Sequence, residues 1–141
     1  EMTKKSEKLL GLARKVFVRN PSDKLFPIEC VGPSFLERLG DCPVVEKPVR
    51  FQMQILPDDM SGSEILRVFR PAVVTLGEFV YDLKHNKDDY RFLQHLVFIG
   101  NSLVDVTLSD SGWFFHADPI EDRKKWFSGS VVHSRRFDKK K

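Results

Sequence analysis

His116 and Asp118 are the two residues of this sequence best placed for acid–base chemistry. Residues two apart in a strand point to the same face of a sheet, so these side chains can meet there. A histidine held by a carboxylate can take up and release a proton near neutral pH. Hydrolysis also needs a nucleophile, and none is recognisable in the sequence beside this pair. We therefore do not expect a hydrolase.

The remaining histidines and the cysteines lack the spacing of a metal site. His85, His95 and His133 stand in unrelated contexts, without an HExxH motif or a pair at helical ligand spacing. Cys30 and Cys42 form neither a CxxC pair nor the framework of a secreted disulfide protein. Two free thiols are typical of a reducing compartment, which favours the cytoplasm or the nucleus.

A metal-dependent nuclease would need clustered carboxylates and a lysine. The chain offers these residue types at loose spacing, in Asp58, Asp59, Glu64, Asp82 and Lys84. Helix capping and surface solvation already explain the first three. The eight glycines are scattered and build no phosphate-binding loop. We expect no metal and no cofactor, and a small nuclease-like enzyme stays only as a third alternative.

Aromatic and basic residues alternate near the C-terminal end, and they are the stronger functional signal. The candidate binding residues there are Trp113, Phe115, Arg123, Lys124, Lys125, Trp126, Arg135 and Arg136. Strand alternation puts Phe114 on the face opposite Trp113 and Phe115. If that sheet is covered on both sides, all these rings are core. If one side is open, rings beside cations can stack unpaired bases, cage a methylated lysine or line a peptide groove.

Charge is unevenly distributed along the chain. Residues 1–25 carry seven basic and three acidic residues, a net +4, and residues 119–141 carry eight and three, a net +5. Residues 26–118 carry eight basic and fourteen acidic residues, a net −6. The stretch 3–18 predicts an amphipathic helix, and four further candidate binding residues lie on or next to it: Lys4, Lys8, Lys15 and Arg19. Basic ends of this kind can contact phosphates or an acidic partner.

The longest nearly unbroken apolar run extends from Tyr90 to His116. Gly100-Asn101 is a two-residue hairpin signal, and Asp110-Ser111-Gly112 marks a second turn. These signals predict a three-stranded antiparallel meander. Residues 49–56 alternate apolar and polar side chains, which predicts a strand with one buried and one solvated face.

Taken together, the patterns predict an α+β fold. We expect an antiparallel sheet of about five strands, at 49–56, 90–99, 102–108, 113–117 and 129–137. Helices are expected at 3–18 and 63–70, the second opened by a capping box at Ser61 and Glu64. A short helix fits 33–40, and 73–84 fits a helix or a strand, of which we favour the helix. A small closed barrel, OB-like or SH3-like, is the alternative architecture.

The length of 141 residues suits one domain, 1–141, and a first residue other than Met indicates a fragment of a longer protein. Residues 1–5 and 138–141 are expected to be flexible. No apolar run is long enough to span a membrane. We expect a non-catalytic binding module that contacts nucleic acid, preferably single-stranded, through its basic ends and the aromatic and basic surface. The alternative is a protein-interaction module that binds an acidic or modified-lysine peptide.

Overall fold

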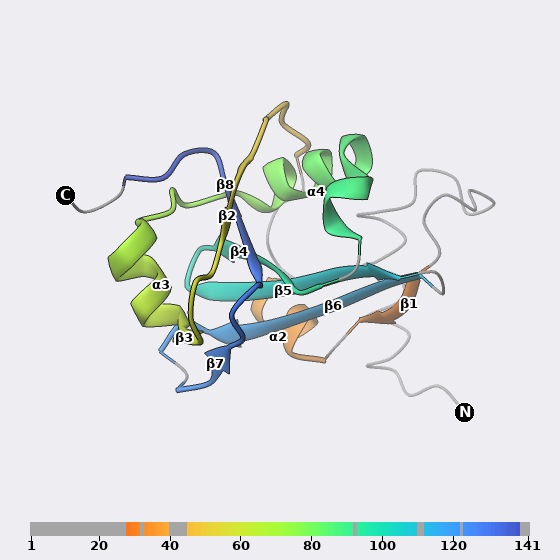
Figure 1. Cartoon of the computed structure of the whole chain (residues 1–141). Coiled ribbons are helices and arrows are strands. Elements are labelled where there is room, and N and C mark those ends of the chain that lie inside the picture. Colours follow the sequence, from red (N-terminus) through yellow and green to blue (C-terminus); the bar gives the residue numbers. More distant parts are fainter. Residues whose placement is uncertain are drawn as a thin grey trace.

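A computed structural model describes residues 28–31, 33–39, 45–91, 93–109, 112–121 and 123–138 (Figure 1). The strands are β1 (Ile28–Val31), β2 (Gln52–Ile55), β3 (Met60–Ser61), β4 (His95–Ile99), β5 (Ser102–Ser109), β6 (Gly112–Pro119), β7 (Lys125–Trp126) and β8 (Val131–Ser134). The helices are α2 (Pro33–Leu39), α3 (Gly62–Phe69), α4 (Leu76–His85) and the 3₁₀ turn η1 (Lys87–Tyr90). The expected helix at 3–18 lies outside the described residues.

Six of these strands form one sheet in the order β1-β6-β5-β4-β8-β2, and β3 pairs with β7 in a small second sheet. In Figure 1 the strands β2, β4 and β8 run steeply across β5 and β6, so the main sheet is strongly twisted. Its outer strands, β1 and β2, are not paired with each other. The α+β prediction is confirmed, but the sheet is open and the barrel alternative is not supported.

The predicted meander is present, because β4 pairs with β5 and β5 with β6, both antiparallel. Gly100 lies in the first turn with φ of 56°, a left-handed conformation that glycine adopts readily. Ser109 pairs with Gly112 across the second turn. The two hairpins therefore begin and end where the turn signals predict.

A purely antiparallel sheet was the wrong prediction. β8 pairs with β4 in parallel, and β1 pairs with β6 in parallel. The chain leaves β6 through β7 and returns on the far side of β4, where all four residues of β8 become buried. A strand buried on both faces belongs inside a sheet rather than at its margin, which explains why β8 lies between β4 and β2.

A capping box marks the start of each of two helices, α3 and α4. The Ser61 hydroxyl accepts from the Glu64 amide at the start of α3, as the sequence predicts, and Thr75 and Glu78 do the same for α4. Because Thr75 is the cap, Val73 and Val74 precede the helix, and Val74 forms a parallel bridge with Ile99. The ambiguity of 73–84 is thus resolved in favour of a helix at Leu76–His85. None of the described helices is long and apolar enough to cross a membrane.

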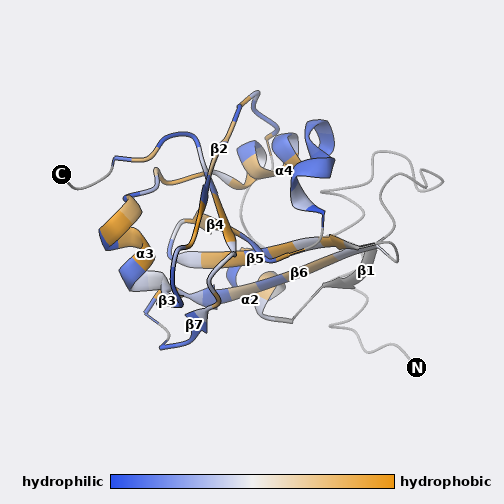
Figure 2. Cartoon of the chain, viewed as in Figure 1, coloured by the Kyte–Doolittle hydropathy of each residue, from blue (hydrophilic) through white to orange (hydrophobic). Residues whose placement is uncertain are grey.

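Apolar side chains form two clusters, one on each face of the sheet. The first packs α2 and α4 against the sheet through residues such as Phe35, Phe79, Tyr90 and Trp113. The second packs α3 and β7 through Ile65, Phe69, Leu96 and Trp126. Figure 2 shows the matching pattern, with the central strands hydrophobic and α4 hydrophilic on its outer turns.

The strand predicted at 49–56 departs from its expected burial. Met53 is 49% exposed and Ile55 is 65% exposed, although their alternation predicts a buried face. β2 is the last strand of the sheet, and the first cluster reaches only as far as Phe51 on this face. The prediction was wrong because alternation indicates which side chains share a face, whereas coverage of that face depends on the neighbouring elements.

Candidate binding groove and charged clusters

The aromatic candidates separate into buried and exposed rings. Trp113, Phe115 and Trp126 are each at most 2% exposed and belong to the two core clusters. Phe114 points to the opposite face from its neighbours, as alternation predicts, and is 38% exposed, while Phe127 is 69% exposed. The three buried rings offer no open face to a base, and Phe127 is the ring most accessible beside the basic stretch.

The basic candidates beside these rings differ in how far they are engaged. Lys124 lies 3.6 Å from the Asp118 carboxylate and 4.3 Å from the centre of the Trp126 ring, so it belongs to an intramolecular cluster. Arg123 and Lys125 are exposed. Lys4, Lys8, Lys15 and Arg19 lie outside the described residues.

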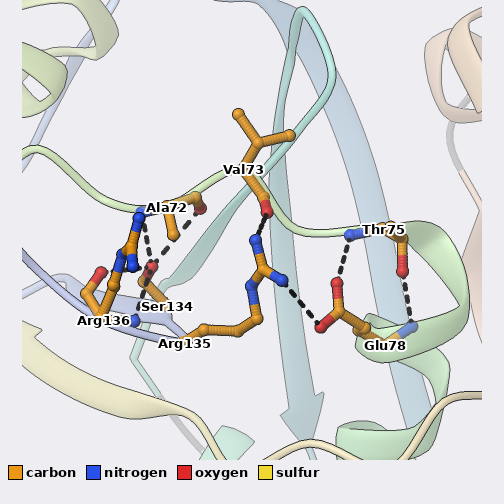
Figure 3. Close-up of polar contacts among 7 residues, drawn as sticks. All are labelled: Ala72, Val73, Thr75, Glu78, Ser134, Arg135 and Arg136. Carbon is orange, nitrogen blue, oxygen red and sulfur yellow. Dashed lines mark hydrogen bonds and ion pairs between the residues drawn. The ribbon is translucent and has the colours of Figure 1, made fainter.

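Arg135, directly after β8, holds the segment that joins α3 to α4. Its guanidinium donates to the carbonyl oxygen of Val73 at 2.7 Å and pairs with the buried Glu78 carboxylate at 3.5 Å (Figure 3). The Ser134 hydroxyl accepts from the Ala72 amide at 2.8 Å and donates to the carbonyl oxygen of Arg136. Together these contacts fasten residues 72–78 to the end of β8.

A groove of about 1010 Å³ lies beside this segment. Its apolar lining residues are Leu39, Val45, Pro48, Val73, Val74, Leu76 and Ile99. Leu39, Val74, Leu76 and Ile99 are buried and belong to the first core cluster, so they form the floor. Val45 is 75% exposed and Val73 is 63% exposed, so the groove opens to solvent between them.

Close backbone packing builds one wall of the groove. The segment 45–48 crosses the start of α4 at Gly77, where a β-carbon would lie 1.8 Å from the carbonyl oxygen of Val45. Only glycine permits this approach. The Lys47 amide donates to the Gly77 carbonyl oxygen at 3.5 Å, and Lys84 pairs with Glu46 at 3.2 Å. The sequence gives a signal for this wall only in the glycine near the helix start.

The opposite wall is held by Arg38 at the end of α2. Its guanidinium donates to the Ser102 hydroxyl at 2.6 Å and to the Asn101 carbonyl oxygen at 3.1 Å. These bonds join α2 to the β4–β5 turn, on the rim of the groove. Rim charges of both signs, on Glu37, Arg38, Glu46 and Lys47, surround an aliphatic floor, and no aromatic ring is among the described lining residues.

A second polar cluster contains the pair predicted from sequence spacing. His116 Nε2 lies 3.0 Å from Asp118 Oδ1, which confirms the geometry of that pair. The Ser34 hydroxyl lies 3.2 Å from His116 Nδ1, so α2 adds a hydroxyl from 82 positions away. In a serine hydrolase the carboxylate contacts Nδ1 and the hydroxyl contacts Nε2, which is the reverse order. The cluster joins α2 to β6, and sequence spacing gave no signal for Ser34.

Asp105 lies opposite His116 on the neighbouring strand. Burial raises the pKa of the Asp105 carboxyl to about 6, although Lys124 and His116 act in the opposite direction. Its Oδ1 atom is buried and has no hydrogen-bond partner in the described part of the chain. Asp105 therefore carries a proton more readily than an ordinary aspartate.

A third set of titratable groups is sealed inside the first cluster. Tyr90 donates to the Asp82 carboxylate, and His95 Nδ1 lies 2.9 Å from His133 Nε2. Burial, followed by the neighbouring His95, lowers the pKa of His133 to about 3. Burial also raises the pKa of Asp82 and that of Tyr90. These groups are enclosed, so they act on stability rather than on a ligand.

Within the described ranges, no three His, Cys, Asp or Glu side chains gather as metal ligands. The carboxylates Asp58, Asp59 and Glu64 instead lie near α3, where Glu64 caps the helix and Asp59 accepts from the Ser128 amide at 2.8 Å. In comparisons with known proteins, no family model, no curated protein and no solved structure matches this chain.

Proposed function

We propose that this chain is a non-catalytic protein-interaction module whose groove binds aliphatic side chains of a partner peptide. The observation that carries the proposal is the open groove of about 1010 Å³ with an aliphatic floor and a charged rim. Concave apolar sites with a few polar groups at the margin are typical of ligand binding. A groove of this volume has room for several aliphatic side chains.

The chemistry of the lining selects the kind of peptide. Stacking of bases and caging of methylated lysine both require aromatic rings, whereas the described lining offers Val, Leu, Ile and Pro side chains. Burial of one leucine or isoleucine side chain there stabilises a complex by roughly 1.5–3 kcal/mol. Charges of both signs on the rim can pair with polar residues that flank the buried side chains.

The walls are fastened independently, which keeps the groove formed before a partner arrives. Arg38 fixes α2 to the β4–β5 turn, and the Lys84–Glu46 pair fixes the segment 45–48 to α4. Arg135 fixes the segment 72–75 through a hydrogen bond to the Val73 carbonyl oxygen. A preformed site loses little conformational entropy on binding, and this supports recognition by side-chain insertion.

Selection from a library of random, unstructured peptides tests the proposal. We expect enrichment of sequences with two or more aliphatic residues, and we expect these peptides to shift the NMR signals of Leu39, Val74 and Ile99. Enrichment of acidic or aromatic sequences without aliphatic anchors would contradict the proposal, as would peptides that perturb only residues away from the groove.

A second candidate function is contact with single-stranded nucleic acid at residues 123–127. One observation favours it: Phe127 is 69% exposed and follows the exposed residues Arg123 and Lys125. One ring can stack one base, and the two cations can contact its phosphates. This site is smaller than the surface expected from the sequence, because Trp113, Phe115 and Trp126 belong to the core.

A further inference from the structure

β2 is an outer strand of the main sheet and pairs only with β8 among the described strands. Its exposed apolar side chains, Met53 and Ile55, lie on one face. An outer strand with apolar side chains readily accepts another strand, unless charges or prolines oppose this. Pro48 and Pro57 bracket β2, so only the short stretch between them is open to pairing.

The backbone hydrogen-bonding groups of β2 point alternately toward β8 and toward the open edge. Leu56 donates its amide to Ser130, on the side of β8. Because backbone groups alternate in direction along a strand, the amides and carbonyls of Met53 and Ile55 face the open edge. A strand added to this edge must therefore form its bonds with these two residues.

One register satisfies these bonds with an identical strand. If two copies pair antiparallel about a twofold axis at Gln54, Met53 of each copy lies opposite Ile55 of the other. Both residues have edge-facing backbone groups, so each pair exchanges two hydrogen bonds. The exposed Met53 and Ile55 side chains then pack on each other across the strands, as cross-strand apolar pairs do.

The same register brings opposite charges together. Arg50 precedes β2 and Asp58 follows it, and both are exposed. Arg50 and Asp58 lie four positions on either side of Gln54, so pairing about Gln54 brings the Arg50 end of each copy to the Asp58 end of the other. An isologous contact repeats each such pair, so two ion pairs form for one interface.

From this complementarity we propose that the chain self-associates through β2, with Gln54 on the twofold axis. The register accounts for the exposed apolar residues, for the phase of the open backbone groups and for the charges at both ends. The contact is independent of the groove, because none of the groove-lining residues belongs to β2. A short strand pair buries little area, so the dimer is a weak one.

Charge reversal provides the test, with sedimentation measured between about 10 µM and about 1 mM, the range of weak complexes. Wild type should become dimeric with rising concentration. Arg50→Asp alone and Asp58→Arg alone should each stay monomeric over that range, because like charges face each other. An equimolar mixture of the two variants should form a heterodimer, because each variant supplies the charge that the other lacks.

A cross-link checks the position of the axis. With Cys30 and Cys42 replaced by serine, Gln54→Cys should form a disulfide with itself on mild oxidation, and Asp59→Cys should not. A wild type that stays monomeric, or a dimer that both charge reversals leave intact, would overturn the proposal. Failure of the Gln54→Cys protein to cross-link beyond the Asp59→Cys control would also overturn it.

Discussion

The Tyr90 and His133 rings stack face to face in the interior, with centroids 4.3 Å apart and planes 14° from parallel. Tyr90 ends the turn η1 and His133 lies in the middle of β8, so this stack joins segments more than 40 residues apart. The Tyr90 hydroxyl donates to Asp82 of α4, and His133 contacts His95 of β4. Four elements therefore meet at one buried polar network.

Replacement of Tyr90 by phenylalanine should destabilise the fold by about 1–3 kcal/mol. The stacked ring remains, but Asp82 loses a hydroxyl donor inside the core. Urea unfolding measures the change. Tyr81→Phe is the matched control, since this partly exposed tyrosine stacks on His85 at the surface and should change the free energy of unfolding by less than about 0.5 kcal/mol. Equal effects of the two variants would contradict the assigned role of Tyr90.

Arg135 and Arg136 should differ in their effect on stability. Arg135→Met removes the partner of the buried Glu78 carboxylate and a donor to Val73, so we expect a loss of about 1–2 kcal/mol. Arg136 pairs only loosely with Asp138, at 3.8 Å, and Arg136→Met should change stability by less than about 0.5 kcal/mol. Thermal or urea unfolding of both variants makes the comparison. A larger effect at Arg136 would refute the structural assignment of Arg135.

Between about pH 4 and about pH 6, Asp105 and His133 should contribute to the pH dependence of stability with opposite signs. Burial raises the pKa of Asp105 from 3.8 to about 6, so the folded chain holds a proton that the unfolded chain releases, and acid stabilises the fold. Burial and His95 lower the pKa of His133 from 6.5 to about 3, so the unfolded chain takes up a proton there, and acid destabilises the fold. The two effects nearly cancel.

Asp105→Asn should leave the destabilisation by acid at His133 without its counterpart. Unfolding free energies measured across this range should fall with decreasing pH about 1.4 kcal/mol per unit more steeply than in wild type. At neutral pH the variant should be more stable, because an uncharged amide costs less to bury. If the slopes of Asp105→Asn and wild type coincide, Asp105 does not titrate as described.

Contact with single-stranded nucleic acid, the second candidate function, has its own test at Phe127. Anisotropy titrations with an oligothymidine should show weak binding that falls as salt rises. Phe127→Ala should weaken it by about 1–3 kcal/mol, the contribution of one stacked base. Leu93→Ala, at an equally exposed apolar position outside residues 123–127, serves as the control. Binding that ignores both salt and Phe127 would remove this candidate.

Local signals in the sequence predicted much of the fold. The capping box at Ser61 and Glu64, the turn at Gly100 and the alternation around Phe114 all act between residues close along the chain. Such features depend on backbone geometry over a few positions, so one sequence suffices to find them. They place α3, the meander and the outward direction of Phe114 correctly.

The features that the sequence did not predict depend on contacts between distant segments. Ser34 meets His116 across 82 positions, and nothing in either local pattern indicates that α2 begins beside β6. Coverage of Met53 and Ile55 depends on how far the first core cluster extends, and the parallel place of β8 depends on the path of the chain after β6. The groove shares this dependence, since four separate segments line it.

Binding of aliphatic side chains in the groove is tested most directly by the affinity of one selected aliphatic peptide for three forms of the chain. By calorimetric titration, Val73→Arg should weaken binding at least about tenfold, because a charged side chain then occupies the mouth of the groove. Val68→Arg, at an exposed valine of α3 outside the groove, should bind as wild type does. Equal affinity of Val73→Arg and wild type for that peptide would contradict the claim.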